Sequence, residues 1–283
     1  MRVFVLSIFL ISTIYAKSLF SNNEQVENSK YISALKDLVI STQKTRGLTN
    51  SYLNGNESTL LLIYANKKEM KKAIGIMESL PLASDAIVNN RATSISQSLI
   101  KLNHKALKKD ANSVFEQYTE LIAQTLMLAQ TVSRHGSKEL NPLGKEASIV
   151  MMEVILPLCE YVGQLRGMGS GIVAKGNISK SKLNKMSVIL SEIESLSSKL
   201  QIDMDMILAK YKDKYDLSVS TNLVYIQQAT QKYIILTKTE VFKKNISIDA
   251  NDYFDEGTAL ISLILKVFNE NNKAILEDSK GWI

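Results

Sequence analysis

Two arginines are the residues best suited to chemistry, because they recur in similar apolar surroundings. Arg46 lies in "TRGLTNSYLNGN" (45–56) and Arg166 lies in "LRGMGSGIVAKGN" (165–177). Arginine is scarce in this chain, with five residues against 29 lysines. A guanidinium presents a planar fork of donors that can hold two oxygens of one anion, which an ammonium group cannot do. The choice of arginine therefore indicates a partner with paired oxygens.

Helical spacing predicts that both arginines point inward. Residues 11, 7 and 4 positions before and 7 after an arginine lie within about 40° of its direction on a helix. These residues are mainly apolar in both segments: Leu35, Val39, Thr42 and Leu53 around Arg46, and Ile155, Cys159, Val162 and Val173 around Arg166. A desolvated guanidinium is costly unless an anion pairs with it. We therefore expect an anionic group at each arginine.

That anion has two possible origins. One is an internal carboxylate in a buried salt bridge, and the candidates are Glu78, Glu153, Glu160 and Glu194. The other is a small anion from solution. The acids occupy different relative places in the two segments, whereas the residue four positions after each arginine is polar in both, Asn50 and Ser170. This match favours an external anion, and the salt bridge stays the alternative.

Glycines next to the arginines predict a close approach of another group. Gly163, Gly167 and Gly171 recur at every fourth residue, and Gly47 follows Arg46. On a helix they form one stripe without side chains, against which a backbone or a small ligand can lie. The run "GMGSG" is not expected to be a phosphate-binding loop, because no strand precedes it and no Lys-Ser/Thr pair follows it.

The rest of the chain has the pattern of an all-α protein. It has three prolines, and apolar residues recur at three- and four-residue spacing. Helices are predicted at 28–54, 57–80, 84–109, 111–134, 143–175, 180–212, 219–243 and 250–278. Gly136 and Gly176 are predicted to follow helix ends, and Pro142 is predicted to begin a helix. Pro157 falls within a predicted helix and should kink it.

Three pairs of similar segments predict an internal duplication. The arginine segments are 120 residues apart, "MESL" (77–80) matches "IESL" (193–196), and "FEQYTELI" (115–122) matches "FDEGTALI" (254–261). Because the pairs occur in the same order, we expect two homologous halves, residues 17–140 and 141–283. Each half has the length and helix count of a four-helix bundle. The predicted fold is two such bundles in tandem.

Residues 1–16 have the layout of a secretory signal peptide. One positive charge at Arg2 precedes a short apolar run, and the small residue Ala16 stands before Lys17. The run is shorter than the roughly 20 residues that span a membrane. We therefore expect cleavage after Ala16 and a periplasmic location, with an uncleaved membrane anchor as the alternative.

Several other classes of function are not favoured by the sequence. His104 and His135 are expected at the surface, and no Cys, His and carboxylate cluster has metal-ligand spacing, so we expect neither an enzyme nor a metal or cofactor. The single cysteine, Cys159, is expected to be a buried, inert thiol. The formal net charge is +6, but lysines alternate with acids rather than forming a basic stripe. Nucleic-acid binding is therefore not expected.

The sequence resembles the nitrate- and nitrite-sensing (NIT) domain family. The resemblance rests on "QKTRGLTNSYLNG", "EYVGQLRGMGSGIVAKG" and "YFDEGTALISLI", and it covers nearly the whole chain after residue 16. It implies a fold of two tandem four-helix bundles, with one arginine from each half binding nitrate or nitrite at their junction. Arg46 and Arg166 match those positions. Nitrate is planar and its oxygens suit the guanidinium fork.

The predicted function is therefore an extracytoplasmic sensor of nitrate or nitrite. Thr42, Thr49, Asn50 and Ser170 are predicted to supply neutral donors beside the arginines. Binding between the halves would change how the bundles pack. Relatives usually carry a membrane segment or an output domain, so we expect a separate membrane-bound signalling partner, and a monomer or homodimer. The alternative is a periplasmic helical scaffold or adaptor whose arginines form internal salt bridges.

Overall fold

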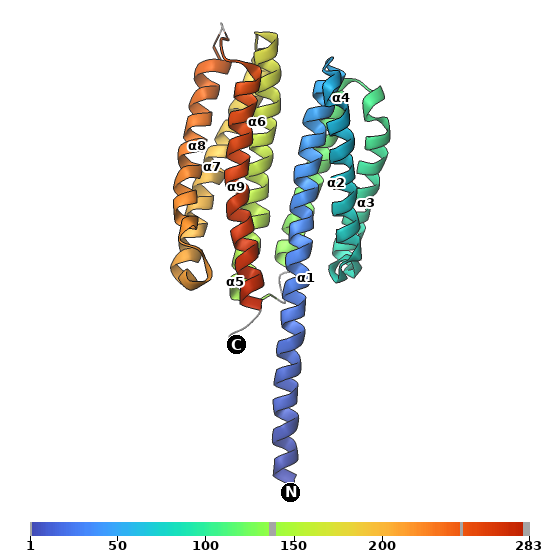
Figure 1. Cartoon of the computed structure of the whole chain (residues 1–283), viewed down its shortest axis with the longest axis vertical. Helices are drawn as coiled ribbons and strands as arrows, with labels where there is room; N and C mark the ends of the chain where they lie inside the picture. Colours follow the sequence, from blue (N-terminus) through green and yellow to red (C-terminus); the bar gives the residue numbers. More distant parts are fainter. Residues whose placement is uncertain (1, 136–139, 244–245, 280–283) are drawn as a thin grey trace.

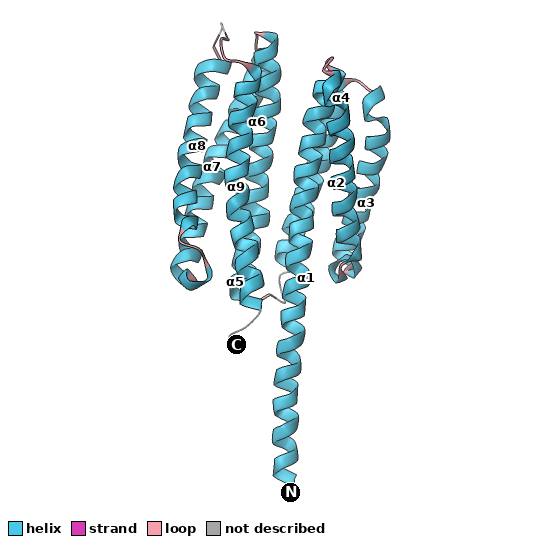
Figure 2. Cartoon of the chain, in the orientation of Figure 1, coloured by secondary structure: helices cyan, strands magenta, loops and turns pink. Residues whose placement is uncertain are grey.

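The computed structural model describes residues 2–135, 140–243 and 246–279, and within these ranges the chain forms helices and turns and no β-strand (Figure 2). The predicted all-α class is confirmed. The eight predicted helices are present, and most of their ends agree with the prediction to within a few residues. A low proline and glycine content allows these long helices, since both residues destabilise a helix interior.

The first bundle contains four helices from the N-terminal half of the chain. They are α1 (Arg2–Leu53), α2 (Leu60–Ser79), α3 (Ala86–Lys105) and α4 (Ala111–His135). Short 3-10 turns connect them at Glu57–Thr59, Pro81–Ser84 and Ala106–Lys108. α1 packs against α2 and α4, and α3 packs against α4. Apolar side chains from all four helices fill the space between them.

The second bundle begins with one long helix that changes its geometry midway. It consists of α5 (Pro142–Val150), a π-helical turn (Met151–Ile155) and α6 (Leu156–Lys175). The remaining elements are α7 (Lys180–Lys210), a 3-10 turn (Lys212–Lys214), α8 (Ser218–Leu236), a second π turn (Thr237–Val241) and α9 (Ala250–Ser279). α6 packs against α7 and α9, and α8 packs against both α7 and α9.

The two bundles lie side by side with their long axes roughly parallel (Figure 1). α1 of the first bundle contacts α6 and α9 of the second, and α4 contacts α5 and the first π turn. The junction is therefore built from helices that also form the two cores. The N-terminal part of α1, blue in Figure 1, extends beyond both bundles.

The helix ends follow the predicted local signals. Asn141 caps α5, its Oδ1 atom accepting a hydrogen bond from the Gly144 amide at 2.7 Å, and Pro142 is the first helical residue. Gly176 ends α6 in the left-handed conformation, with φ of 70°, which glycine adopts without a Cβ clash. Gly136 lies outside the described residues.

The predicted disturbance at Pro157 takes the form of the first π turn. Proline has no amide hydrogen, so it cannot make the helical bond to the carbonyl four residues earlier, here that of Glu153. The wider turn just before it lets the Leu156 amide bond to the Met151 carbonyl instead. The helix therefore continues past proline to Lys175. No local signal in the sequence predicts the second π turn.

Helix α1 is much longer than predicted, because it begins at Arg2 rather than near residue 28. No proline or glycine occurs before Gly47, so nothing in this segment interrupts a helix. Among the described helices, the segment Pro142–Lys175 is long and apolar enough to cross a membrane. Its most apolar window is 72% buried inside the protein, as expected for the core helix of a bundle.

Candidate functional site

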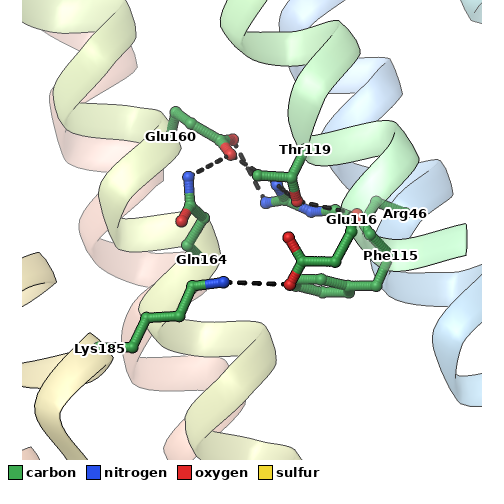
Figure 3. A network of polar contacts seen from close by, with 7 residues as sticks. All are labelled: Arg46, Phe115, Glu116, Thr119, Glu160, Gln164 and Lys185. Atoms are coloured by element: carbon green, nitrogen blue, oxygen red, sulfur yellow. Dashed lines mark hydrogen bonds and ion pairs between the residues drawn. The ribbon is translucent and has the colours of Figure 1, made fainter. Parts of the chain in front are cut away.

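Arg46 forms a buried ion pair inside the junction between the bundles. Its side chain is 2% exposed. Its Nη1 atom donates to Glu160 Oε1 at 2.5 Å and to Thr119 Oγ1 at 3.0 Å, and its Nη2 atom donates to Glu160 Oε2 at 3.3 Å. Arg46 comes from α1 and Glu160 from α6, so this buried ion pair joins the two bundles (Figure 3).

Two further polar contacts lie near this ion pair. The Gln164 Nε2 atom donates to Glu160 Oε1 at 2.9 Å, one turn along the same helix. Nearer the surface, Lys185 on α7 pairs with Glu116 on α4 at 3.0 Å, again across the junction (Figure 3). The Glu116–Lys185 pair is largely exposed, so solvent screens it and its contribution to stability is small.

Arg166 is buried but lacks a comparable partner. It is 8% exposed, and its Nη1 atom donates to Thr258 Oγ1 at 2.9 Å. Within the described residues its Nε atom has no hydrogen-bond acceptor and no carboxylate forms an ion pair with it. Burial lowers the pKa of its guanidinium, and the positive charge of Arg46 lowers it further. Arginine stays protonated despite such shifts, so this is a buried cation that forms no ion pair with a described carboxylate.

The two arginines are held in the same way by the two halves of the chain. Arg46 stacks on the ring of Phe115, with 4.9 Å from its Cζ atom to the ring centroid. Arg166 stacks on Phe254 at 4.4 Å. Each accepting threonine donates its own proton to the carbonyl of that phenylalanine, Thr119 at 2.9 Å and Thr258 at 3.0 Å. The threonine oxygens therefore face the guanidinium as acceptors.

These phenylalanines and threonines are functional-site residues that the sequence argument missed. They are the matching positions of the repeated blocks "FEQYTELI" (115–122) and "FDEGTALI" (254–261). The blocks indicated a duplication, but nothing assigned them to the arginines. The available signal was that each block has a phenylalanine and a threonine four residues apart, which places both on the same face of a helix. The equivalent contacts support the duplication. The duplication and the domain boundaries both remain predictions.

The four predicted neutral donors are placed differently. The Thr42 hydroxyl donates to the Leu38 carbonyl at 2.7 Å, and the Ser170 hydroxyl donates to the Arg166 carbonyl at 2.9 Å. Both protons are thus used within their own helices. Asn50 Oδ1 accepts from the Asn54 side chain at 3.3 Å. Thr49 is buried beside the Tyr118 hydroxyl in the first bundle. Whether any of them contacts a ligand remains a prediction.

Gln43 is a further candidate that sequence reasoning did not single out. It is 3% exposed, and its Nε2 atom has no acceptor in the described part of the chain. Its Oε1 atom lies 3.0 Å from the place where a Cβ on Gly163 would be, and Arg46 Nη2 lies 3.6 Å from that place. A side chain at 163 would therefore crowd Gln43 beside Arg46. Gln43 Nε2 and Arg166 Nε are thus both buried donors at the junction that have no acceptor among the described residues.

The predicted close approach along the glycine stripe is confirmed at two of its positions. Gly163 faces Gln43, and a Cβ on Gly167 would lie 3.4 Å from the Phe115 ring. Gly171 and Gly47 have no such neighbour among the described residues. The "GMGSG" run is the interior of α6, so it is not a phosphate-binding loop.

The salt-bridge alternative is correct for one arginine and not for the other. Glu160 pairs with Arg46, as that alternative allowed. Glu153 pairs instead with Arg134 at 2.8 Å. The remaining two candidates, Glu78 and Glu194, are exposed. The preference for an external anion therefore does not hold at Arg46, because the carboxylate of Glu160 from the other bundle already accepts hydrogen bonds from both Nη atoms of its guanidinium.

The other sequence-based expectations concern residues outside the junction. His104 is exposed as predicted, whereas His135 is partly buried and its Nε2 atom lies 2.8 Å from Asp85 Oδ2. Cys159 is buried, as expected, and burial raises the pKa of its thiol. A thiol held in its protonated form is a poor nucleophile.

The similarity of this pair of helical bundles to a known family points to a sensing or regulatory role. The model of the NIT family, described as nitrate and nitrite sensing, matches residues 37–271. The chain belongs to this family, which confirms the resemblance seen in the sequence.

A solved structure supports the fold. The structure of the NasR transcription antiterminator superposes with a TM-score of 0.73 at 14% sequence identity, covering 97% of this chain and 74% of that one. At this identity the similarity establishes the fold alone. A comparison with curated proteins found no match.

Proposed function

We propose that this chain senses nitrate or nitrite by holding one anion between Arg46 and Arg166 at the bundle junction. The observation that carries the proposal is the buried guanidinium of Arg166, whose hydrogen-bond partner within the described chain is a neutral threonine. A buried charge without a counter-ion is expensive, and an anion from solution would remove that cost. Nitrate and nitrite both offer the paired oxygens that a guanidinium fork binds.

The unpaired donors at the junction suit such a ligand. Arg166 Nε and Gln43 Nε2 are buried, and each could donate to an oxygen of the anion. The rings of Phe115 and Phe254 keep the guanidinium planes in place, so little side-chain freedom would be lost on binding. Within this proposal Thr42, Thr49, Asn50 and Ser170 line the surroundings, and Gln43 takes the role of neutral donor.

Binding at this place would act on the packing of the bundles. Arg46 belongs to α1 and Arg166 to α6, and these helices meet across the junction. An anion bridging them favours arrangements in which the two guanidinium groups approach, which without an anion repel each other. The bundles would thereby shift relative to one another, and a separate membrane-bound protein would read that shift.

The test is a nitrate and nitrite titration of the purified protein by calorimetry. We expect binding by the wild type and a loss of about tenfold to a hundredfold in affinity for Arg166→Lys, because lysine cannot donate two parallel hydrogen bonds to the anion. We expect a loss of the same size for Arg46→Lys, because lysine cannot keep both hydrogen bonds to Glu160 that position the two helices at the site. Nitrate should also raise the melting temperature of the wild type, since a ligand of the folded state stabilises it. Both lysine variants should lose most of that rise.

Arg91→Lys is the matched control, because Arg91 is exposed and donates to Thr131 far along the chain from the junction segments. It should bind like the wild type. Absence of nitrate and nitrite binding by the wild type would reject the proposal. The scaffold alternative, favoured by the Arg46–Glu160 pair, would then be the better account.

We also propose that the protein acts outside the cytoplasm. The layout of residues 1–16 supports export, and the first tertiary hydrogen bond described for α1 is made by Gln25, whose Nε2 donates to the Ile275 carbonyl at 2.9 Å. Cleavage after Ala16 would leave that bond in place. A reporter fused after Lys17 should be active in the periplasm. Mass spectrometry of the exported chain distinguishes cleavage from a retained membrane anchor, and a cytoplasmic reporter would contradict the proposal.

A further inference from the structure

The buried charged side chains are on α1 and α6, two helices that contact each other across the junction. They are Arg46, Arg166 and Glu160, and the other polar residues found buried, among those whose side-chain burial is described, are neutral. Glu160 interacts electrostatically with both arginines, while hydrogen-bonding to Arg46. Two guanidinium groups and one carboxylate leave a net charge of +1 inside the protein.

We infer that Glu160 determines the charge selectivity of the site, so that it accepts a monovalent anion and rejects a divalent one. This inference rests on the proposed function. One monovalent anion beside Arg166 brings the buried charge to zero. A divalent anion such as sulfate would leave an excess negative charge in a desolvated place, where it is costly.

The contacts of Glu160 indicate that its charge has a specific role at the site. Its two oxygens accept from both Nη atoms of Arg46, and Gln164 donates to Oε1 at 2.9 Å. The carboxylate is therefore held in place and is 4% exposed. A position that merely filled space in the core would not need a charge. Here the carboxylate cancels one of two cations and leaves the other for the ligand.

The position is also specific to one half of the chain. The residue 120 positions earlier, which the repeat aligns with Glu160, is Ile40. If both halves carried a glutamate, the buried charge would be zero before any anion bound. If neither did, it would be +2 and would suit a divalent anion. With a single carboxylate, one monovalent anion brings the buried charge of the site to zero.

The experiment compares nitrate and potassium sulfate by calorimetry at constant ionic strength, for the wild type, Glu160→Gln and Glu116→Gln. Glutamine keeps the size of glutamate, and its oxygen can still accept from Arg46. Glu160→Gln should raise the sulfate-to-nitrate affinity ratio by about tenfold or more, because an added unit of site charge acts twice on a divalent anion. Glu116→Gln makes the same charge change at the exposed edge of the junction and should leave the ratio within about twofold.

The wild type provides a test that needs no variant. It should bind sulfate at least about a hundredfold more weakly than nitrate. Equal affinities would overturn the inference while leaving the proposed function intact. An unchanged ratio in Glu160→Gln would do the same. Absence of nitrate and nitrite binding by the wild type would instead reject the proposed function, and this inference with it.

A second variant, which adds a negative charge to the site, keeps the inference testable if Glu160→Gln does not fold. Gln164→Glu adds a carboxylate beside Glu160 without removing a buried group, since Gln164 is only partly buried. The site charge then falls from +1 to zero. Nitrate affinity should drop by about tenfold. Unchanged nitrate affinity in a folded Gln164→Glu protein would overturn the inference.

Discussion

The two halves of the junction use the same parts and differ in charge. In each half an arginine stacks on a phenylalanine and donates to a threonine one turn further along the same helix as that ring. Glu160 from the second half pairs with Arg46 of the first half, whereas no described carboxylate pairs with Arg166. Similar surroundings therefore hold one arginine that is paired with a carboxylate, the closed position, and one that is not, the open position. The difference supports the proposal that a ligand binds at Arg166.

A second difference concerns how the space behind each arginine is filled. The repeat aligns Thr49 with Gly169 and Tyr118 with Gly257. In the second half a Cβ on Gly169 would lie 2.2 Å from the Tyr253 ring, and one on Gly257 would lie 2.7 Å from the Tyr233 hydroxyl. Two tyrosines from that half occupy the room that the glycines leave. The same architecture thus tolerates a local exchange of large and small residues.

Replacing each arginine by methionine is the strongest test of the contrast. Arg46→Met leaves the buried Glu160 carboxylate without its partner and should cost about 3 to 5 kcal/mol in the free energy of unfolding. Arg166→Met removes an uncompensated charge, so without nitrate it should be close to neutral or stabilising. Urea unfolding measures both values. Arg91→Met, an exposed control, should stay within about 0.5 kcal/mol of the wild type. Equal losses for the two buried arginines would contradict the contrast.

Replacing a glycine behind Arg166 should have a smaller effect on stability. Gly169→Ala would bring a methyl group into the Tyr253 ring and should destabilise the protein by about 1 to 3 kcal/mol. Gly171→Ala, two residues later on the same helix, meets nothing within 4 Å and should stabilise the protein by up to about 1 kcal/mol. Thermal unfolding of both variants gives the comparison. If both substitutions stabilised the protein, the packing of Tyr253 on α6 would be wrong.

For the two threonines we expect the larger loss of stability in the second half of the chain, whereas for the two arginines we expect it in the first half. Thr258→Val removes the described acceptor of Arg166 and should cost about 1.5 kcal/mol or more in unfolding free energy. Thr119→Val should cost about 0.5 to 1 kcal/mol, because Arg46 keeps both oxygens of Glu160. Valine preserves the shape of threonine, so packing changes little. Thr131→Val, which removes an exposed acceptor of Arg91, serves as the control. A larger loss at Thr119 than at Thr258 would argue against an open position at Arg166.

The smallest expected effect comes from a more exposed ion pair between the bundles, Arg134 on α4 with Glu153 in the first π turn. Arg134 is 71% exposed, and its hydrogen bond holds the pKa of the Glu153 carboxyl below its usual value. A lowered pKa in the folded state stabilises the protein above the unfolded pKa, and the gain is lost as the pH falls through the folded value. Glu153→Gln should therefore cost about 0.5 kcal/mol at pH 7 and nothing at pH 2. A cost that persisted at pH 2 would show that the ion pair is not its source.

Much of the architecture follows from the sequence by itself. Apolar spacing, scarce prolines and glycines, and local signals such as Pro142 and Gly176 determine where helices begin and end, because these are properties of short segments. Spacing around Arg46 and Arg166 also placed both guanidinium groups inside. A side chain's direction on a helix depends only on its position in the turn.

Only the tertiary structure decided which groups meet those arginines. Glu160 lies 114 residues from Arg46 along the chain, and Thr258 lies 92 residues from Arg166. Such contacts depend on how helices from separate bundles approach, and helical periodicity contains no information about that approach. The charge balance at the junction is a property of this packing, because the two buried arginines would carry +2 if Glu160 did not face Arg46, and the sum would be zero if Glu153 faced Arg166 as well.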